Sequence, residues 1–302
     1  MTEMYLRNFN LVAFLAVIKE KTGLNDSQIA KKLKISKSMI WRYNNNLNPL
    51  RYSFYVELCG LVGMDKNSFD FELFCPRNHS KSANIPELDE NLSEFIGILL
   101  GDGHLSKKGH GIIITGGKAD GDYITKYVPK LMKNLFRKTP KTYFLNERGT
   151  IIQTLFYSKL VCEYLAKEYT IPIGKKHEIN IPQQVLENEF FLMSCLRGLV
   201  DTDGGVYRHN KKSIQVCFYN SSKSLLAGVN DGFVKVGLKP HYYWNKRRER
   251  GVVSICGSDV NKYFKKIGSN NPKNQAKFFV FEEYGEVPKN TEIENFKSNI
   301  FL

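Results

Sequence analysis

The sequence predicts a mixed α+β fold in which an all-α domain precedes a duplicated body, and three observations support this prediction. Residues 5–73 carry helical periods and almost no strand signal. Two later segments, 95–103 and 196–204, repeat one apolar pattern that ends in Asp-Gly. After each of them, strand-like stretches and hairpin turns recur at matching intervals, which is typical of a repeated supersecondary unit.

The composition is that of a folded chain without a membrane segment. The chain has 302 residues, of which 42% are hydrophobic, which suffices for about two domains with proper cores. Apolar runs such as 95–100 are far shorter than the ~20 residues that cross a bilayer. Residues 1–10 do not have the pattern of a signal peptide, so we expect a cytoplasmic protein. The six cysteines are scattered without a CxxC pair, which argues against disulfides and zinc.

The charge distribution favours a polyanionic partner. The chain carries a formal net charge of +14. Residues 1–78 hold 11 basic and 7 acidic side chains and residues 282–302 hold 2 basic and 5 acidic ones, so residues 79–281 carry +13 of this charge. A folded segment this basic most often binds nucleic acid. A solvated lysine-rich surface is the alternative explanation.

The N-terminal helices have the pattern of a DNA-reading module. Capping residues at 25–27 precede a helix over 28–33, and Ser36 is a good N-cap for a second helix over 37–43. The second helix would expose side chains that suit phosphates and base edges, namely Lys37, Ser38, Trp41 and Arg42. The segment resembles the helix-turn-helix of Cro/repressor-type regulators, although Lys34 stands where that family usually has a turn glycine. A small helical bundle with a basic face is the alternative.

Composition changes suggest the domain boundaries. Residues 78–90 are polar and contain Pro86, which predicts a linker. We therefore expect a helix-turn-helix domain at 1–77, the linker at 78–90, a first repeat at 91–185, and a second repeat with an acidic C-terminal tail at 186–302.

The two repeated helices combine features that call for an explanation. Glycine inside a helix costs about 1 kcal/mol relative to alanine, yet Gly97 and Gly198 occupy the third position of each motif. Close contact between the two helices would explain both glycines. Asp102 and Asp203 end the helices, where a negative charge opposes the helix dipole. If the helices pack in parallel, the two carboxylates meet in an oxygen-rich site suited to Mg²⁺.

The segments after the two motifs also correspond. Hairpin turns end at Gly149 and Gly251, which lie 47 and 48 residues after Asp102 and Asp203. Helix-like stretches occupy 123–136 and 159–168 in the first repeat, and 223–236 and 259–266 in the second. Each repeat is therefore predicted to run helix, hairpin, helix, hairpin, helix.

Residues 92–281 resemble the single-chain, two-motif LAGLIDADG homing endonucleases. The resemblance implies two αββαββα halves about a pseudo-two-fold axis in a monomer, with Gly97 and Gly198 at the helix interface. It also implies a basic saddle in the major groove of double-stranded DNA and Mg²⁺-dependent cleavage of both strands. The implied metal ligands are Asp102 and Asp203, together with the adjacent Gly101 and Thr202. Leu100 departs from the motif where Asp201 stands in the second one, but the family binds metal through the second Asp.

Each active site of the family usually includes a lysine late in the repeat. The resemblance assigns this role to Lys176 and Lys273, with Lys175 and Lys277 as neighbouring alternatives. Ordinary loop lysines are the competing interpretation.

Other basic residues fall on predicted hairpin tips or just after the motifs, where they would grip phosphates. They are Lys107, Lys108, Arg148, Arg208, Lys246, Arg247, Arg248 and Arg250. Strand residues that could reach bases are Gln215, Tyr219, Tyr243 and Asn245.

Three functions are consistent with these patterns. The first is a site-specific DNA endonuclease. The second is a DNA-binding transcriptional regulator that has the same scaffold and does not cleave. The third is an RNA-splicing maturase, since a basic saddle would also accept RNA. The two aspartates favour the nuclease, because a scaffold that only binds needs no facing carboxylates beside phosphates.

Overall fold

A computed structural model describes residues 4–74, 83–146, 148–210 and 213–289. The chain forms two compact units, which meet in sequence between Ile85 and Pro86. Residues 78–82 of the predicted linker and residues 290–302 of the predicted tail lie outside the described residues. Within the described ranges, no helix is long and apolar enough to span a membrane.

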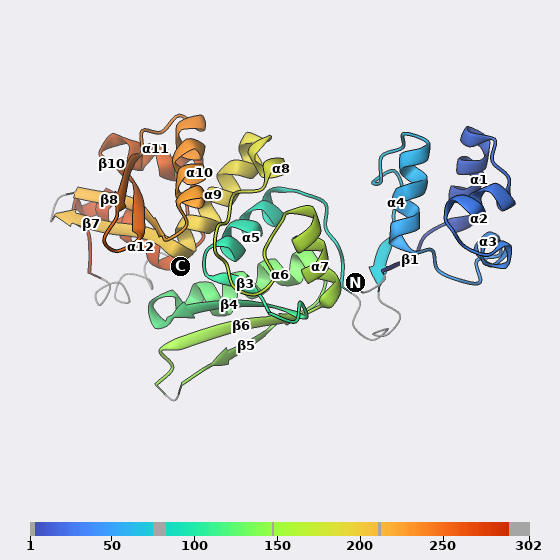
Figure 1. Cartoon of the computed structure of the whole chain (residues 1–302). Helices are drawn as coiled ribbons and strands as arrows, with labels where there is room; N and C mark the ends of the chain where they lie inside the picture. Colours follow the sequence, from blue (N-terminus) through green and yellow to red (C-terminus); the bar gives the residue numbers. More distant parts are fainter. Residues whose placement is uncertain (1–3, 75–82, 147, 211–212, 290–302) are drawn as a thin grey trace. The chain divides into compact units, whose positions relative to one another are not determined.

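The N-terminal unit is mainly helical (Figure 1). Its helices are α1 (Leu11–Thr22), α2 (Asp26–Lys32), α3 (Lys37–Asn44) and α4 (Tyr52–Leu61). The prediction of an all-α unit is wrong, because β1 (Tyr5–Arg7) and β2 (Glu72–Phe74) pair antiparallel. Leu6 faces Leu73 in this pair, and both are buried. Strands of three residues are too short to leave a period in the sequence.

Helices α2 and α3 pack against each other. Asn25 and Gln28 form a capping box at the start of α2, and the Ser36 side chain accepts a hydrogen bond from the Met39 amide at the start of α3. Between the helices, Lys34 has a φ of 53°. This is the left-handed conformation that glycine adopts without steric cost, so the turn keeps the backbone geometry of a glycine although a lysine occupies it.

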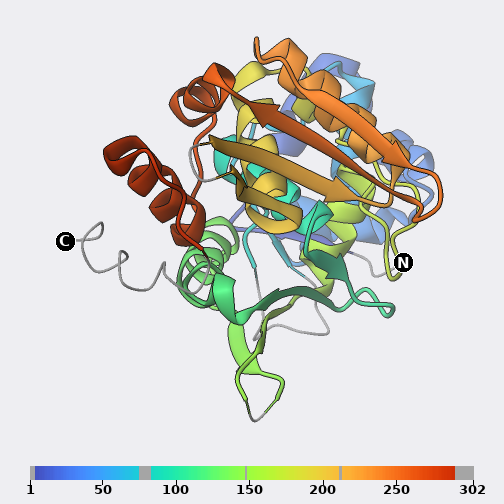
Figure 2. The same cartoon turned by 90° about the vertical axis from the view of Figure 1, so that its left-hand side faces the viewer.

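The second unit contains two four-stranded antiparallel sheets with the orders β3-β4-β6-β5 and β7-β8-β10-β9. Figure 2 shows the strands of the second sheet in gold and orange above those of the first in green. The elements of the first half are α5 (Glu90–Leu100), β3 (Gly103–Leu105), β4 (Gly111–Gly117), η2 (Lys118–Asp120), η3 (Tyr123–Tyr127), α6 (Val128–Phe136), β5 (Lys141–Phe144), β6 (Ile151–Tyr157) and α7 (Lys159–Glu168). Those of the second half are α8 (Gln183–Leu186), α9 (Glu189–Asp203), β7 (Gly204–Asn210), β8 (Ser213–Asn220), α10 (Lys223–Lys235), β9 (His241–Asn245), β10 (Arg250–Cys256), α11 (Ser258–Lys266) and α12 (Pro272–Tyr284).

Both halves have the predicted sequence of helix, hairpin, helix, hairpin, helix, and the helix predicted at 159–168 is α7. Helix α12 was not predicted. Pro272 occupies its first turn and the Asn271 side chain caps it, an arrangement typical of helix starts. These residues form a helix where the sequence suggested only a lysine-bearing loop.

Each sheet buries one face beneath helices and leaves the other more exposed. In β6 the buried residues are Ile152, Thr154 and Phe156, which alternate with half-buried or exposed ones. Helix α7 contacts β4, and α10 and α11 contact β10. The period of two therefore gives each sheet a core face and an open face.

Candidate active site

Helices α5 and α9 touch along their length. A Cβ atom on Gly97 would lie 2.1 Å from the Cys195 carbonyl oxygen, and one on Gly198 would lie 2.2 Å from the Glu94 carbonyl oxygen. One turn further on, a Cβ on Gly101 would lie 2.0 Å from Thr202 Oγ1. The contacts advance in the same direction along both helices, so the helices are parallel and their C-terminal ends meet.

The two motif aspartates lie at this shared end. Asp102 follows the last turn of α5, and Asp203 is the last residue of α9. Burial, then the negative charges of Asp203 and Asp120, raise the pKa of Asp102 to about 7. Burial likewise raises the pKa of Asp203, although Lys176 and a 2.8 Å hydrogen bond from Asn220 Nδ2 oppose this. Negative charge is thus costly at this end of the helices, and a cation would relieve it.

Lys176 lies at the same place. It belongs to the strap of residues 174–179, which the Gly174 amide joins to the Leu105 carbonyl at 2.8 Å in the first half. In the second half, Glu178 accepts a 3.3 Å hydrogen bond from Ser222 Oγ. Lys176 Nζ donates to the carbonyls of Leu99, Leu100 and Gly101. Burial lowers the pKa of Lys176, while Asp203 and Asp102 oppose this shift.

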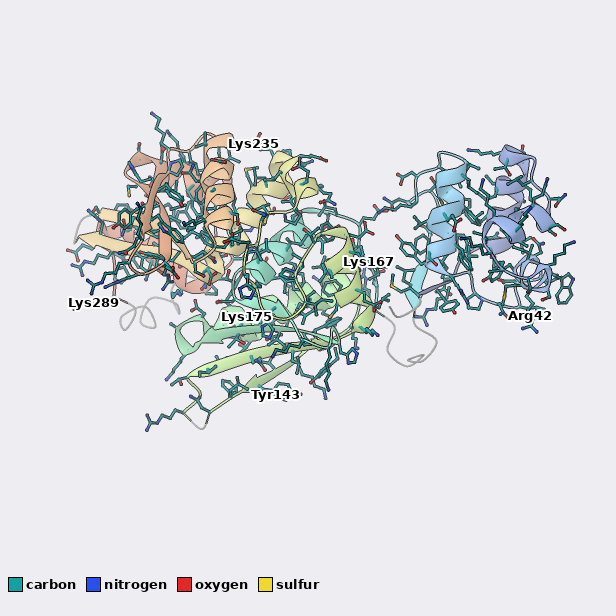
Figure 3. All side chains as sticks on the ribbon, in the orientation of Figure 1. Arg42, Tyr143, Lys167, Lys175, Lys235 and Lys289 are labelled. Carbon is teal, nitrogen blue, oxygen red and sulfur yellow. The ribbon has the colours of Figure 1, made fainter. Side chains whose placement is uncertain are left out.

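The second predicted lysine has a different partner. Lys273 lies in the first turn of α12, and its ammonium is 2.5 Å from Asp120 Oδ1 in the first half. Its positive charge also lowers the pKa of Asp102. Of the neighbouring alternatives, Lys175 is exposed, and Figure 3 labels it. Lys277 donates to the Val206 carbonyl at 2.8 Å, and burial lowers its pKa to about 8.

The oxygen atoms at the helix ends fit a hard divalent cation in part. Three carbonyls converge on the Lys176 ammonium, and two carboxylates with raised pKa values lie beside them. Among the described residues, however, no group of three His, Cys, Asp or Glu side chains could hold a metal. The Thr202 hydroxyl donates to the carbonyls of Gly198 and Leu199, within its own helix. A cation here would therefore complete its coordination with water or phosphate oxygens.

Two further polar residues, Asp120 and Asn220, act on the aspartates at this end and carry no motif in the sequence. Asp120 lies 18 residues after Asp102, and Asn220 lies 17 residues after Asp203. Asn220 bonds Asp203, and Asp120 raises the pKa of Asp102. Their matching distances from the two motifs were a usable signal, since each lies at or just beyond the end of the second strand of its half.

Asp201 is buried and hydrogen-bonded to the loop that precedes α12. It is 2% exposed and accepts hydrogen bonds from Ser269 Oγ, the Asn270 and Asn271 amides and Asn274 Nδ2. Burial raises its pKa to about 7. Leu100, at the same motif position in the first half, is 1% exposed.

A buried ion pair also joins the two halves. Glu94 on α5 is 2% exposed and accepts hydrogen bonds from Arg197 on α9 at 2.9 and 2.7 Å. Tyr127 and Asn270 donate to the same carboxylate at 2.7 and 2.8 Å. A buried carboxylate is stable only when it is paired and hydrogen-bonded in this way.

The predicted DNA-contacting residues are spread over several surfaces. On α3, Lys37, Ser38, Trp41 and Arg42 are exposed, with Trp41 at 58%, and Figure 3 labels Arg42. The exposed turn residues of the second unit are Lys107, Lys108, Arg148, Lys246, Arg247 and Arg248. Gln215 lies on the open face of its sheet. Arg208 pairs with Ile214, whose side chain is on the core face, so the Arg208 side chain does not leave the strand on the open face.

Comparison with known proteins adds a family match in the second half. A family model for a LAGLIDADG-like domain matches residues 191–268. This stretch runs from α9 to α11 and includes Asp201, Thr202 and Asp203.

One curated relative matches part of the chain. Over 128 residues the chain is 27% identical to the replication factor C small subunit of Methanocaldococcus jannaschii. The match covers 42% of this chain and 7% of that protein, so the chain spans less than a tenth of the relative's length.

Among the solved structures that are similar to the chain, two examples have 20% and 16% sequence identity. The homing endonuclease I-DmoI in complex with DNA and Mn gives a TM-score of 0.43 at 20% identity, covering 60% of this chain and 98% of that one. The N-terminal LAGLIDADG domain of DUF199/WhiA gives a TM-score of 0.43 at 16% identity, covering 62% and 88%.

Proposed function

We propose that the chain is a site-specific endonuclease of double-stranded DNA that hydrolyses phosphodiester bonds with a divalent metal, Mg²⁺. The observation that carries the proposal is the parallel contact of α5 and α9, which brings Asp102, Asp203 and Lys176 into one electrostatic cluster. The LAGLIDADG-like match over 191–268 supports it independently.

The residues at the helix ends have roles that follow from their chemistry. Asp102, Asp203 and the Gly101 carbonyl would hold divalent ions, which activate a water and stabilise the leaving oxygen when bound. Lys176, once released from its carbonyl partners, would stabilise negative charge on the attacked phosphate. Lys273, once released from Asp120, would stabilise negative charge on the second attacked phosphate in the same way. Asn220 orients the Asp203 carboxylate through its hydrogen bond.

The remaining surfaces fit binding along a duplex. The two halves share one element order and sheet order, and we infer that a pseudo-two-fold axis relates them within a monomer. Their open sheet faces would lie in the major groove, which admits a two-stranded ribbon, and their basic turns would contact phosphates. Helices α2 and α3 would act as a helix-turn-helix, with α3 presenting Lys37, Trp41 and Arg42 to DNA.

One observation favours a second function, a DNA-binding regulator that does not cleave. Lys176 already occupies the Gly101 carbonyl, so the positive charge at the helix ends is supplied by the protein itself. In such a protein the lysine would be a permanent substitute for the metal ion.

A cleavage experiment separates these functions. The full chain is incubated with duplex DNA from its own genomic locus, from which any insertion has been removed, with and without Mg²⁺. We expect Mg²⁺-dependent double-strand cuts that Asp102→Asn and Asp203→Asn each abolish. Asp231→Asn, an exposed aspartate on α10, is the matched control and should cut normally.

The other outcomes identify the alternatives. Tight, salt-sensitive binding of duplex DNA without any cut would support the regulator and overturn the nuclease. Preference for structured RNA over duplex DNA would instead support a maturase.

A further inference from the structure

The open faces of the two sheets carry different chemistry. On the first sheet, Ile113 pairs with Leu155, and Gly117 pairs with Ile151. The side chains of these three aliphatic residues alternate with the buried residues of β4 and β6, so they point to the open face. Ile113 and Leu155 are half-buried and Ile151 is 43% exposed. This face therefore exposes a row of branched aliphatic side chains to solvent.

The polar side chains in the middle of this face are already paired. Gln153 Nε2 donates to Thr115 Oγ1 across the β4–β6 pair at 3.2 Å. Tyr143, opposite Gln153, is 42% exposed and adds an aromatic surface at the edge strand, where Figure 3 labels it. By the register, His104 on β3 lies beside Ile113 and the exposed Lys141 on β5 lies beside Leu155, so polar side chains flank the aliphatic residues on the outer strands.

The open face of the second sheet carries more polar side chains, beside Val252 and its cross-strand neighbours Tyr219 and Tyr243. It carries Gln215, Ser254 and Asn245, and by the register their side chains alternate with buried Val216, Val253 and Ile255. Arg250 lies beside Asn245, with its guanidinium 5.5 Å from the centre of the Tyr219 ring. Amide and guanidinium groups are the side chains that form bidentate hydrogen bonds with adenine and guanine edges.

The following inference rests on the proposed DNA binding. We propose that each half of the second unit contacts one half of the target duplex, its half-site, and that the two halves recognise bases by different chemistry. The first half recognises thymine C5-methyl groups through Ile113, Leu155 and Ile151. The second half recognises purine edges through Gln215, Asn245 and Arg250. The thymine methyl is the apolar group that the major groove exposes, and aliphatic side chains gain by removing it from water. The preferred target is therefore an asymmetric duplex with a thymine-rich half-site on one side.

Deoxyuridine provides a direct test, because it pairs like thymidine and lacks only the methyl group. The full chain carrying Asp102→Asn and Asp203→Asn, to prevent cutting, first selects binding sites from a randomised duplex library. Thymidines of the selected site are then replaced by deoxyuridine, one half-site at a time, and the Kd is measured at fixed salt. We expect about a fourfold loss of affinity for each contacted methyl in one half-site and none in the other.

Two variants assign the effect to the sheets. Ile151→Ser, at an exposed position, should abolish the deoxyuridine effect at one base pair and leave the second half-site unchanged. Gln215→Ala should relax purine preference in the second half-site and retain the full deoxyuridine effect in the first.

The outcomes separate this inference from the function beneath it. If selection yields a sequence but deoxyuridine has equal or no effect in both half-sites, the inference is wrong and DNA recognition stands. If Ile151→Ser leaves the deoxyuridine effect intact, the first sheet does not read the methyl groups. If no duplex sequence is selected, the proposed DNA binding itself fails.

Discussion

The two acidic helix ends share one sequence pattern but differ in their polar surroundings. In the first half, α5 ends before Asp102, Leu100 is buried in the core, and Lys176 bonds the helix carbonyls. In the second half, α9 continues through Asp203, and Asp201 binds the loop that leads into α12. That loop sends Lys273 back to Asp120 in the first half.

The difference shows that the repeat conserves backbone contacts more closely than polar partners. A Cβ atom added to Gly97 or to Gly198 would lie at nearly the same distance, 2.1 and 2.2 Å, from a carbonyl oxygen of the opposite helix. The lysines, in contrast, bond a set of carbonyls in one case and a carboxylate in the other. Close packing of two helices leaves few solutions, whereas a charge at a helix end can be satisfied in several ways.

The largest effect is expected from filling the helix contact. The Gly198→Ala substitution places a methyl 2.2 Å from the Glu94 carbonyl oxygen, and backbone cannot move aside cheaply. We expect the free energy of unfolding to fall by about 3 kcal/mol or more, measured by urea denaturation. Gly228→Ala in α10, where the nearest atom would be 3.8 Å away, is the control. It should gain up to about 1 kcal/mol, and equal stability of both variants would refute the close contact.

The next effect concerns Asp201, which makes the second helix end unlike the first. The Asp201→Leu substitution copies the first half and removes the oxygens that accept hydrogen bonds from the Asn270 amide and from Asn274 Nδ2. Unsatisfied buried donors cost about 1–3 kcal/mol, so we expect a loss of about 2–3 kcal/mol in thermal or urea unfolding. Asp201→Asn keeps one acceptor oxygen and should lose less. If Asp201→Leu leaves the free energy of unfolding unchanged, this loop is held by other contacts.

These two cases also show how far the sequence could predict the site. Glycine inside a helix is costly, so the positions of Gly97 and Gly198 alone predicted a close contact between the two motif helices. The helix bounds and hairpin intervals followed from local periodicity. Nothing local to Lys273 indicates Asp120, however, because the two residues are 153 positions apart and meet only after both halves have folded. The buried pair of Glu94 and Arg197 is similarly non-local, since each side chain alone reads as an ordinary surface charge of a helix.

A smaller effect is expected from pH in the absence of metal. The folded-state pKa of Asp102 is about 7, above its ordinary value of 3.8. Between these values the folded protein holds a proton that the unfolded chain releases, so stability falls as pH rises from about 4 to 7. We expect the Tm to be lower at pH 8 than at pH 5, by an amount worth about 1 kcal/mol for Asp102 after allowing for solvent.

The matched variant and the metal isolate this contribution. Asp102→Asn should reduce the fall in Tm between pH 5 and pH 8, although Asp201, with a pKa of about 7, keeps part of it. Added Mg²⁺ should raise the Tm more at pH 8 than at pH 5. An identical pH dependence in Asp102→Asn would contradict the raised pKa.

The smallest effect is expected from exchanging the polar residues at the ends of the second strands. Asp120→Asn removes a negative charge that raises the pKa of Asp102, so that pKa should fall below about 7. Asn220→Asp removes the donor to Asp203 and adds a negative charge, so the pKa of Asp203 should rise further. Carboxyl ¹³C NMR titration measures both shifts. Unchanged values would mean that the two residues do not act on the aspartates.

The most direct measurement is the binding of Mn²⁺, counted as free ion by electron paramagnetic resonance, to the wild-type chain and its single variants without DNA. Asp102→Asn and Asp203→Asn belong to different halves, and each should weaken Mn²⁺ binding at least tenfold if the helix ends share their cations. Asp201→Asn, a buried carboxylate two residues from Asp203, should bind like wild type. Wild-type affinity in either Asp102→Asn or Asp203→Asn would contradict a site built jointly by the two halves.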